Sequence, residues 1–371
     1  MQLRSPERPN LGSSREGESE PMRIAFVLPG RGNSGGVRCT SIVSEMLRKR
    51  GHTVRIFYQR PDFSISDRLK SLRNRLLYSR SPNWLDEFHG PIEPFLNLTD
   101  IRFDKDEIIV AVGMVISSQM DTLDGIPNPR IQYLHGSTPD RPDLRDKALN
   151  LPLPKIVVAS YLKDLAEQAG RGEVLSVIHN GVDCREYFPS IPECQRIGVG
   201  TIYAVHPAKD PKTVIGVLQR LSKLRPYLPL RVFGADRRPR EISRHIYLRC
   251  PSPAQARDIY SSSQVWVMGS RSEGFSMPIL EAMACGCAVI STDCGGPRDQ
   301  IVDGENGFLV PTGDVERITN RVLLLLDNPD LLTRIQTKAL ETARKFTWTK
   351  CGDGLETALE RVGQHLPASV C

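Results

Sequence analysis

The stretch that decides the fold is residues 265–314, VWVMGSRSEGFSMPILEAMACGCAVISTDCGGPRDQIVDGENGFLVPTGD. The run VWVM is typical of a buried strand, and GSRSEGFS forms a loop after its carboxyl end. Ser276 can cap a short helix that carries Pro278 in its first turn, where proline is tolerated. AVIST is typical of the next strand, and a glycine-rich turn follows it. The stretch therefore predicts a strand–loop–helix–strand unit of a parallel sheet.

Two glutamates in this unit are candidate ligand-binding residues. Glu273 falls in the loop and Glu281 on the helix, so both face the crevice at the carboxyl ends of the strands. The free N–H groups of residues 274–277 point to the same place, which favours an anion such as phosphate. Carboxylates bind the hydroxyls of a vicinal diol through charge-assisted hydrogen bonds. Either glutamate alone is typical of a solvated position, but together with the anion site they indicate a sugar nucleotide.

Outward from this unit, the chain alternates strands and helices. Candidate strands form a first series, RIAFVLP, HTVRIFY, EIIVAVG, RIQYLHG and KIVVAS, and a second series, IGVGTIYAV, PLRVFG, HIYLRC, QVWVMGS and AVIST. Short apolar runs that end in small or polar residues are typical of parallel sheets with crossover helices. A helix is expected over residues 37–50, and further helices after residue 312. The expected fold class is α/β, with two doubly wound, Rossmann-like domains.

The expected domain organisation follows changes in composition along the chain. Residues 1–21 are polar and lack an apolar run, which predicts a disordered tail and not a secretion signal. Residues 22–182 form the N-terminal domain, and residues 183–196, which are irregular, form a hinge. Residues 197–345 form the C-terminal domain. Residues 346–371 contribute a last helix and a tail.

Composition and charge narrow the classes of function. The 371 residues are 40% hydrophobic and 25% charged, as in soluble globular proteins. The net charge of +6 suits anionic ligands or an anionic membrane surface, and no signature of nucleic-acid binding accompanies it. Nine scattered cysteines without C-x2-C spacing favour reduced thiols over a zinc site. A cytoplasmic protein without a membrane span is expected.

A glycine-rich loop near the start offers a second class of function. In LPGRGNSGGVR, residues 28–38, the glycines at 30, 32 and 35 have the G-x-G-x-x-G spacing of dinucleotide-binding loops. An NAD(P)-dependent oxidoreductase would carry an acidic residue at the end of the second strand. That strand ends instead in Gln59 and Arg60, which weakens this alternative, although an arginine suits a 2′-phosphate. The adjacent Gly35 and Gly36, at the start of a helix, let a phosphate approach the backbone closely.

The motif EGFSMPILEAMACG, residues 273–286, resembles the E-x7-E signature of the retaining glycosyltransferase family 4. GENGFLVPTGD, HNGVD at 179–183 and FTW at 346–348 also fit this family, and the resemblance spans about residues 22–362. It implies the GT-B fold, in which two Rossmann-like domains face a central cleft and the C-terminal helix crosses back to the first domain. The N-terminal domain would then face the acceptor and the C-terminal domain would bind the nucleotide sugar.

The resemblance assigns roles to residues of the second domain. Glu273 would contact the hydroxyls of the donor sugar, and the backbone of Gly274 and Phe275 would hold the sugar and its phosphates. Glu281 would bind the donor ribose. Lys209 would neutralise the diphosphate.

Three residues of the first domain complete the expected site. His135 would lie near the transferred sugar, although a lone histidine after a strand is equally typical of a structural hydrogen bond. Gly35 and Gly36 would close onto the donor phosphates. Glu273, His135 and Lys209 are the expected catalytic residues, and neither a metal nor a cofactor is expected.

The resemblance implies transfer of a sugar from a nucleoside diphosphate sugar to the hydroxyl of a glycan or lipid-linked acceptor, with retention, in polysaccharide or glycolipid assembly. The alternative is a non-catalytic protein that binds nucleotide sugars or glycans.

Two departures from the family pattern bear on diphosphate binding. The family often has an arginine shortly before the lysine, which GTIYAVHPAKD lacks, and Asp210 replaces the usual glycine. His206 or Arg271 could supply the lost charge. Asp299 stands where the family usually has glutamate.

Two further segments carry charge. DRLKSLRNRLLYSR, residues 67–80, is basic, with leucines near helical spacing. It predicts either a surface helix packed on the sheet or a peripheral contact with an anionic membrane. The string DKD at 104–106 has the D-x-D form of metal sites in other glycosyltransferases. Because it precedes a strand, it falls at the wrong edge of the sheet for a ligand, and a solvated turn is expected.

Overall fold

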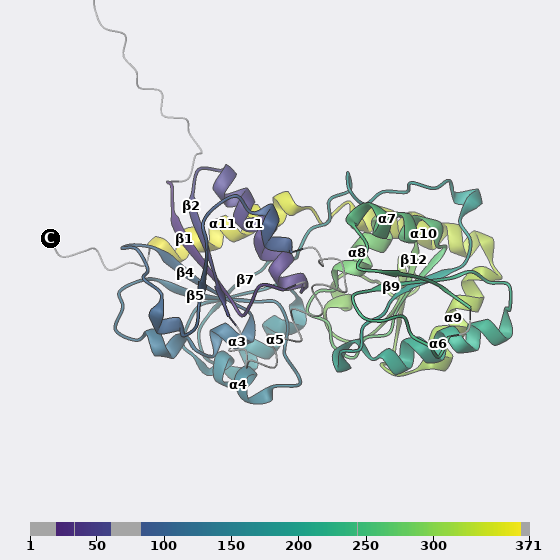
Figure 1. Cartoon of the computed structure of the whole chain (residues 1–371), viewed down its shortest axis with the longest axis horizontal. Helices are drawn as coiled ribbons and strands as arrows, with labels where there is room; N and C mark the ends of the chain where they lie inside the picture. The colour runs from purple at the N-terminus through teal and green to yellow at the C-terminus, as the bar shows by residue number, and fades with distance from the viewer. Residues whose placement is uncertain (1–19, 33, 61–82, 243, 365–371) are drawn as a thin grey trace, which may run out of the picture.

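The computed structural model describes residues 20–32, 34–60, 83–242 and 244–364. Two parallel sheets, each covered by helices, form two α/β domains that lie side by side (Figure 1). The predicted fold class is therefore confirmed. The connection between the sheets, residues 178–198, includes the expected hinge; its boundaries remain a prediction.

The first sheet has seven strands in the order β3-β2-β1-β4-β5-β6-β7, and every pairing is parallel. The strands are β1 (Arg23–Leu28), β2 (Thr53–Gln59), β3 (Ile92–Phe95), β4 (Ile108–Val112), β5 (Arg130–Leu134), β6 (Lys155–Val157) and β7 (Val174–Val177). In the central strand, Ile24 pairs with Val54 on one side and with Ile108 on the other. All five residues from Ile24 to Leu28 are buried, because helices cover both faces of the sheet.

Helices pack on both faces of this sheet. Helices α1 (Gly35–Lys49) and α11 (Trp348–Gln364) lie on one face, and α3 (Gly113–Ser117), α4 (Pro142–Asn150) and α5 (Ser160–Ala169) on the other (Figure 1). Helix α1 begins two residues before its expected start, because Ser34 caps it by accepting a hydrogen bond from the N–H of Val37. Its apolar side chains at 37, 43 and 47 are buried against the sheet. Three 3-10 turns connect these elements: η1 (Trp84–Glu87), η2 (Leu98–Asp100) and η3 (Met120–Leu123).

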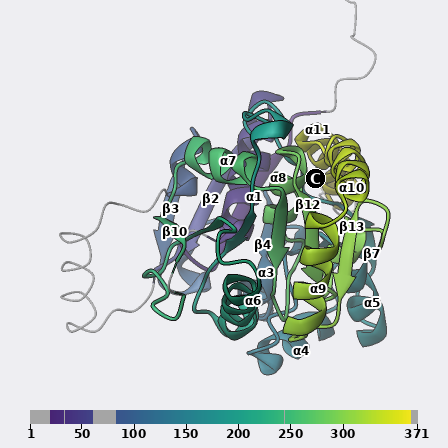
Figure 2. The ribbon, with the colours of Figure 1, turned by 90° about the vertical axis from the view of Figure 1, so that its right-hand side faces the viewer.

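The second sheet has six parallel strands in the order β10-β9-β8-β11-β12-β13. They are β8 (Val199–Ile202), β9 (Leu230–Gly234), β10 (Ile246–Arg249), β11 (Val265–Met268), β12 (Ala288–Thr292) and β13 (Gly307–Val310). Helices α6 (Pro211–Leu224) and α9 (Val315–Leu326) cover one face, and α7 (Pro253–Ser262), α8 (Met277–Ala284) and α10 (Pro329–Ala343) the other (Figures 1 and 2). The 3-10 turns here are η4 (Glu193–Gln195), η5 (Pro207–Lys209) and η6 (Gly296–Asp299).

All ten strands expected from the sequence are present, but three others were not expected. Strands β3, β7 and β13 lie at the edges of the two sheets. An edge strand is only partly covered, so its sequence need not be apolar. IEPF in β3 contains a proline, and all four residues of VLSV in β7 are only half-buried.

Helix α11 returns from the second domain to the first and packs beside α1. Its apolar side chains Leu355 and Leu359 are buried there. The N-terminal end of the helix contacts the segment after β7 so closely that a Cβ on Gly181 would lie 2.2 Å from the backbone nitrogen of Trp348. The predicted crossing of the last helix is therefore confirmed.

Two predictions fall on residues that the structure does not describe. The expected disordered tail lies almost wholly in residues 1–19, and the basic segment at 67–80 lies in residues 61–82. Among the helices that are described, none combines the length and apolar character needed to cross a membrane.

Candidate functional site

The candidate site is a cavity of about 610 Å³ between the carboxyl ends of the two sheets. It is lined by the loops after β1, β4 and β5 from the first domain and by η5, α7 and the start of α8 from the second. The carboxyl ends of parallel strands are where doubly wound domains bind ligands. All eight residues predicted for the site line this one cavity: Gly35, Gly36, His135, Lys209, Glu273, Gly274, Phe275 and Glu281.

Glu281 lies on the first turns of α8 and is buried. One of its carboxylate oxygens accepts a hydrogen bond from Arg38, which comes from α1 of the opposite domain. The other oxygen accepts from the Tyr260 hydroxyl at 2.9 Å. Burial, together with the adjacent Glu281 carboxylate, raises the pKa of Tyr260 well above its ordinary value, so the hydroxyl stays a donor. Glu281 therefore joins the two domains and faces the cavity.

Arg38 is held in the cleft by more than its ion pair with Glu281. Its guanidinium lies 4.6 Å from the centre of the Trp84 ring and 5.6 Å from that of Tyr187, and it donates to the Glu186 carboxylate at 3.3 Å. Stacking on aromatic rings is favourable for arginine. The Nε atom of Arg38 is buried without a hydrogen-bond partner among the described residues. Arg38 thus presents one further donor inside the cavity wall.

Glu273 follows β11 and forms a compact cluster with Lys209. The Lys209 Nζ lies 2.7 Å from one carboxylate oxygen and 2.8 Å from the other, and the Ser270 hydroxyl donates to the first at 2.6 Å. Lys209 ends the turn η5, which brings it across from Glu273. Its side chain is about one-third exposed, whereas Glu273 is buried. The cluster places a cation and a carboxylate together at the open cavity.

The loop after Glu273 carries a glycine where the two domains approach most closely. A Cβ on Gly274 would lie 1.7 Å from the carbonyl oxygen of His135, so no side chain fits there.

Ser276 does not cap α8 with its side chain as the sequence analysis predicted. It precedes α8 with a left-handed φ of 73° and makes no capping hydrogen bond; its hydroxyl is instead buried and unpartnered among the described residues. The Ser276 hydroxyl therefore caps none of the N–H groups at the start of α8, although the Ser276 carbonyl accepts from the N–H of Ile279 at 3.1 Å.

His135 follows β5 and packs against the start of α1. Its Cβ lies 3.4 Å from the position that a Cβ on Gly36 would take, so the glycine makes room for the ring. The ring contacts Tyr133 edge-on, with the ring centres 4.1 Å apart. Burial lowers the pKa of His135 to about 3, so the imidazole is neutral near pH 7. Its Nε2 atom is buried and has no hydrogen-bond partner in the described part of the chain.

The suggestion that His206 or Arg271 replaces the missing arginine is not supported by their positions. Arg271 pairs with Asp210 at 2.9 Å, and the His206 ring caps η5 by accepting from the N–H of Ala208. Neither lines the cavity, and the arginine that does line it, Arg38, comes from the other domain. Asp210 has a left-handed φ of 42°, which explains why glycine is usual at this position, and it caps α6.

Asp299, the other departure from the family pattern, forms a second link between the domains. Its carboxylate lies 2.9 Å from the His179 Nε2 and accepts from the N–H of Ser160. Burial opposes ionisation of Asp299, but these hydrogen bonds outweigh it and lower the pKa of the carboxyl below its usual value. The shorter side chain is therefore accommodated by partners from the first domain.

The cavity residues that were not identified from the sequence include Arg38, Asn180 and Tyr260. Asn180 lines the cavity, and its Oδ1 is buried without a hydrogen-bond partner among the described residues. Arg38 follows the quoted glycine loop, and Asn180 stands inside the quoted HNGVD, but neither has a periodic or motif signal for ligand contact. Only the packing of one domain on the other assigns them to the cleft.

The DKD string lies where the sequence predicts, in a turn before β4 at the amino edge of the sheet. Asp104 pairs there with Arg23 and Arg55. In the described part of the chain, no group of three or more histidine, cysteine, aspartate or glutamate residues could hold a metal ion.

Comparisons with known proteins agree with this geometry. Residues 199–342 match the sequence model of glycosyl transferases group 1. An uncharacterized glycosyltransferase of Methanocaldococcus jannaschii is 35% identical over 96 residues, which are 26% of this chain and 27% of that protein. The D-inositol 3-phosphate glycosyltransferase of Rhodococcus erythropolis is 26% identical over 207 residues, 49% of this chain and 47% of that protein. The chain thus spans about half, or less, of the length of the curated relatives it matches.

Solved structures resemble the whole chain. HepE of Anabaena, in complex with UDP-glucose, superposes with a TM-score of 0.71 at 17% identity, over 92% of this chain and 100% of that one. Sucrose-phosphate synthase of Thermosynechococcus elongatus gives a TM-score of 0.70 at 14% identity, over 92% and 99%. The chain is therefore a two-domain protein of the GT-B fold, and its second domain carries the sequence pattern of glycosyl transferases group 1.

Proposed function

We propose that this protein is a retaining glycosyltransferase of family 4 that moves a sugar from a nucleoside diphosphate sugar to an acceptor hydroxyl. The observation that carries the proposal is that two buried carboxylates of the second domain, Glu273 and Glu281, line the same cavity as Lys209, which pairs with Glu273. Carboxylates suit the hydroxyls of sugar and ribose, and a lysine suits a diphosphate. The match of this domain to glycosyl transferases group 1 supports the same activity.

In this proposal, Glu281 binds the ribose and Glu273 the donor sugar. Both carboxylates already accept hydrogen bonds, from Arg38 and Tyr260 and from Lys209 and Ser270. The ribose hydroxyls replace Arg38 at Glu281, while Tyr260 keeps the carboxylate oriented. Lys209 turns from Glu273 toward the diphosphate. These exchanges preserve the number of hydrogen bonds to each buried charge, which would otherwise be costly.

In this proposal, the N-terminal ends of helices α1 and α8 stabilise the diphosphate leaving group. These ends carry partial positive charge, and the fold holds them in place. Gly35 and Gly36 open α1 without side chains, so that their N–H groups reach the phosphates, and the Gly274–Phe275 backbone at the start of α8 contributes in the same way. Stabilisation of this developing charge by fixed groups lowers the barrier to transfer. Because these charges belong to the protein, no metal is required.

The transfer exchanges one bond at the anomeric carbon for another. The acceptor oxygen bonds to this carbon on the face from which the phosphate leaves, and the bond to the phosphate oxygen breaks. The nucleoside diphosphate takes the electron pair, and the acceptor proton passes to the departing phosphate. In this proposal His135, whose neutral ring has a buried Nε2 without a partner among the described residues, hydrogen-bonds a hydroxyl of the donor sugar once the donor is bound. Closure of the two domains around the bound donor would keep water from the reacting carbon.

The acceptor belongs to the first domain, and we propose a glycan or a lipid-linked sugar, as in polysaccharide or glycolipid assembly. Several relatives are named D-inositol 3-phosphate glycosyltransferases, which makes a phosphorylated polyol a second candidate. Contact with a membrane surface through residues 67–80 stays part of the proposal for a lipid-linked acceptor.

The test is calorimetry with a panel of sugar nucleotides, followed by transfer assays with and without EDTA. Glu281→Ala should weaken binding of the preferred donor by about tenfold to a hundredfold, since one charge-assisted contact is lost. Glu316→Ala, an exposed glutamate on α9 of the same domain, is the matched control and should bind donor normally. Equal affinity for the two variants would contradict the site. Binding without turnover of any donor would identify a non-catalytic binding protein, and loss of turnover in EDTA would refute the metal-independent mechanism.

A further inference from the structure

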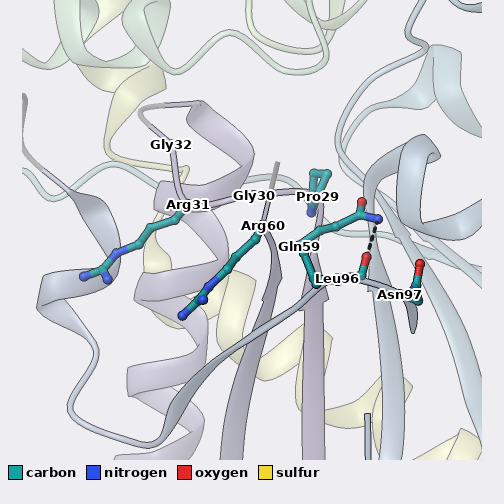
Figure 3. Close-up of a pocket in the computed structure, with 8 residues that line it drawn as sticks. All are labelled: Pro29, Gly30, Arg31, Gly32, Gln59, Arg60, Leu96 and Asn97. Atoms are coloured by element: carbon teal, nitrogen blue, oxygen red, sulfur yellow. Dashed lines mark hydrogen bonds between the residues drawn. The ribbon is translucent and has the colours of Figure 1, made fainter. Parts of the chain in front are cut away.

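A second cavity, of about 600 Å³, opens in the first domain at the carboxyl ends of β1, β2 and β3. Its polar side chains are those of Arg31, Gln59, Arg60 and Asn97 (Figure 3). Two of these four residues, Gln59 and Arg60, are the ones that weakened the dinucleotide alternative above. The proposed binding of the donor uses none of these four side chains.

The pocket is positively charged. Arg31 and Arg60 are among its lining residues, and its described lining residues include no aspartate or glutamate. The Arg31 and Arg60 side chains extend in the same direction from neighbouring segments (Figure 3). Arg31 pairs with Asp86, but the side chains are 43% and 67% exposed, so this ion pair is weak and easily exchanged. Arg60 makes no ion pair with any residue in the described ranges.

The backbone fixes the positions of these groups. The N–H of Arg60 donates to the carbonyl of Phe95 at 2.8 Å, which ties the end of β2 to the end of β3. The Gln59 amide nitrogen donates to the carbonyl of Leu96 at 3.3 Å, and no described residue donates a hydrogen bond to the amide oxygen. Pocket walls that are held by the sheet in this way keep their polar groups in place for a ligand.

The pocket adjoins the cleft on the side opposite to the donor carboxylates. Pro29 lines both cavities, and the loop after it leads to Gly35 and Gly36 at the start of α1. A ligand seated against Arg60 can therefore extend past Pro29 toward the cleft. This is the relation that an acceptor needs, with an anchor remote from the reacting hydroxyl.

We propose that this pocket binds a phosphate group carried by the acceptor, so that the acceptor substrate is a phosphorylated sugar or polyol. The inference rests on the proposed function. Arg31 and Arg60 form paired hydrogen bonds to the phosphate oxygens, for which the planar guanidinium is suited. Gln59 and Asn97 contact nearby hydroxyls. The phosphate itself is not altered; it positions one hydroxyl toward the cleft.

Transfer assays with matched acceptor pairs test the chemistry: glycerol and glycerol 3-phosphate, glucose and glucose 6-phosphate, and inositol and inositol phosphate. We expect turnover of at least one phosphorylated member, with a preference of tenfold or more over its plain partner. In Arg60→Gln, KM for that acceptor should rise about tenfold and kcat should change little, because one charged contact is lost. Arg31→Gln should act in the same direction.

Arg171→Gln is the matched control. Arg171 is exposed between α5 and β7, at the amino edge of the same sheet. Its substitution therefore removes the same charge as Arg60→Gln, but far from the pocket. Its kinetics should equal those of the unchanged protein. Donor binding by calorimetry should be normal in all three variants, which shows that they fold and separates this inference from the donor site.

The phosphate has two sources, a soluble ester or a lipid headgroup, and the assay distinguishes them. Acceptance of the soluble esters identifies the first source. Acceptance of vesicles of phosphatidylinositol but not of phosphatidylcholine, lost in Arg60→Gln, identifies the second. The inference is overturned if donor binding is intact and plain and phosphorylated acceptors, soluble or in vesicles, react or bind equally. It is also overturned if Arg60→Gln and Arg171→Gln do not differ. Failure to bind any donor would instead refute the proposed function.

Discussion

At the scale of single residues, the site depends on small side chains and unpartnered atoms. Gly36 makes room for His135, and Gly274 lets the two domains meet at the carbonyl of the same histidine. Burial in this contact removes the positive charge from the His135 ring. The result is a neutral imidazole beside the cavity, whose Nε2 is buried and has no partner among the described residues.

His135→Asn should change both activity and acid stability. Loss of a hydrogen bond to the donor should lower kcat/KM by about tenfold to a hundredfold. The pKa of His135 is about 3 in the folded protein, below the ordinary value of 6.5, so only the unfolded chain takes up this proton between pH 6.5 and 3. Unfolding therefore becomes easier as the pH falls through this window, and the contribution is absent above pH 7.

Urea unfolding at pH 7 and pH 5 measures the effect of His135 on stability. The loss of unfolding free energy between these two values should be smaller in His135→Asn than in the unchanged protein, by about 2 kcal/mol at most. An equal acid dependence for His135→Asn would contradict a buried, neutral imidazole.

At the scale of elements, α1 and α8 meet across the cleft through Arg38 and Glu281. The side chains are 12% and 7% exposed, so each depends on the other for compensation of its charge. The contact joins residues 243 positions apart in the chain. The local sequence of each helix predicts that helix, but no local pattern predicts the contact between Arg38 and Glu281.

Arg38→Met should open the protein in the absence of ligand. Glu281 would keep only Tyr260 as a partner, and a buried carboxylate without its cation costs about 3–5 kcal/mol, which opening the cleft relieves. Small-angle scattering should show a larger radius of gyration than for the unchanged chain, and saturating donor should reduce it. Arg225→Met, which breaks an exposed ion pair with Asp327 inside the second domain, is the control. Unchanged scattering by Arg38→Met would show that other contacts hold the domains together.

At the scale of the whole molecule, the chain forms two domains and then returns to the first. The sequence predicts both sheets and every interior strand, because VWVM, RIAFV and similar runs must be buried on both faces. It also predicts the residues of the glycine turns and the two glutamates. It does not predict β3, β7 and β13, because a strand at the edge of a sheet does not need an apolar sequence. It also does not predict that Arg38 and Asn180 line the cavity, because this depends on how one domain packs on the other. Neither kind of feature has a local pattern.

The return of α11 should stabilise the first domain specifically. A chain that ends at residue 345 would expose the surface that buries Leu355, Leu359 and Val362. At about 1.5–3 kcal/mol for each side chain, the first domain should lose roughly 5 kcal/mol of unfolding free energy.

Fluorescence can follow the two domains separately during urea unfolding. Trp84 lies in the first domain and Trp266 in the core of the second, and the full chain with Trp348→Phe is the control because it keeps only these two reporters. Single-tryptophan versions should show a much lower midpoint for Trp84 after truncation and a small change for Trp266. Equal shifts for both would mean that α11 stabilises the domains jointly.

The ion pair between Arg38 and Glu281 also has a consequence for rates. In the ligand-free protein the carboxylate proposed for the ribose is occupied by the other domain, so the donor enters only after this contact has broken. Binding then selects a minor open population, and the observed association rate levels off at high donor concentration, at the rate of opening. The same barrier governs the departure of the nucleoside diphosphate. The slowest step of turnover would then be the separation of two side chains, not the making of a glycosidic bond.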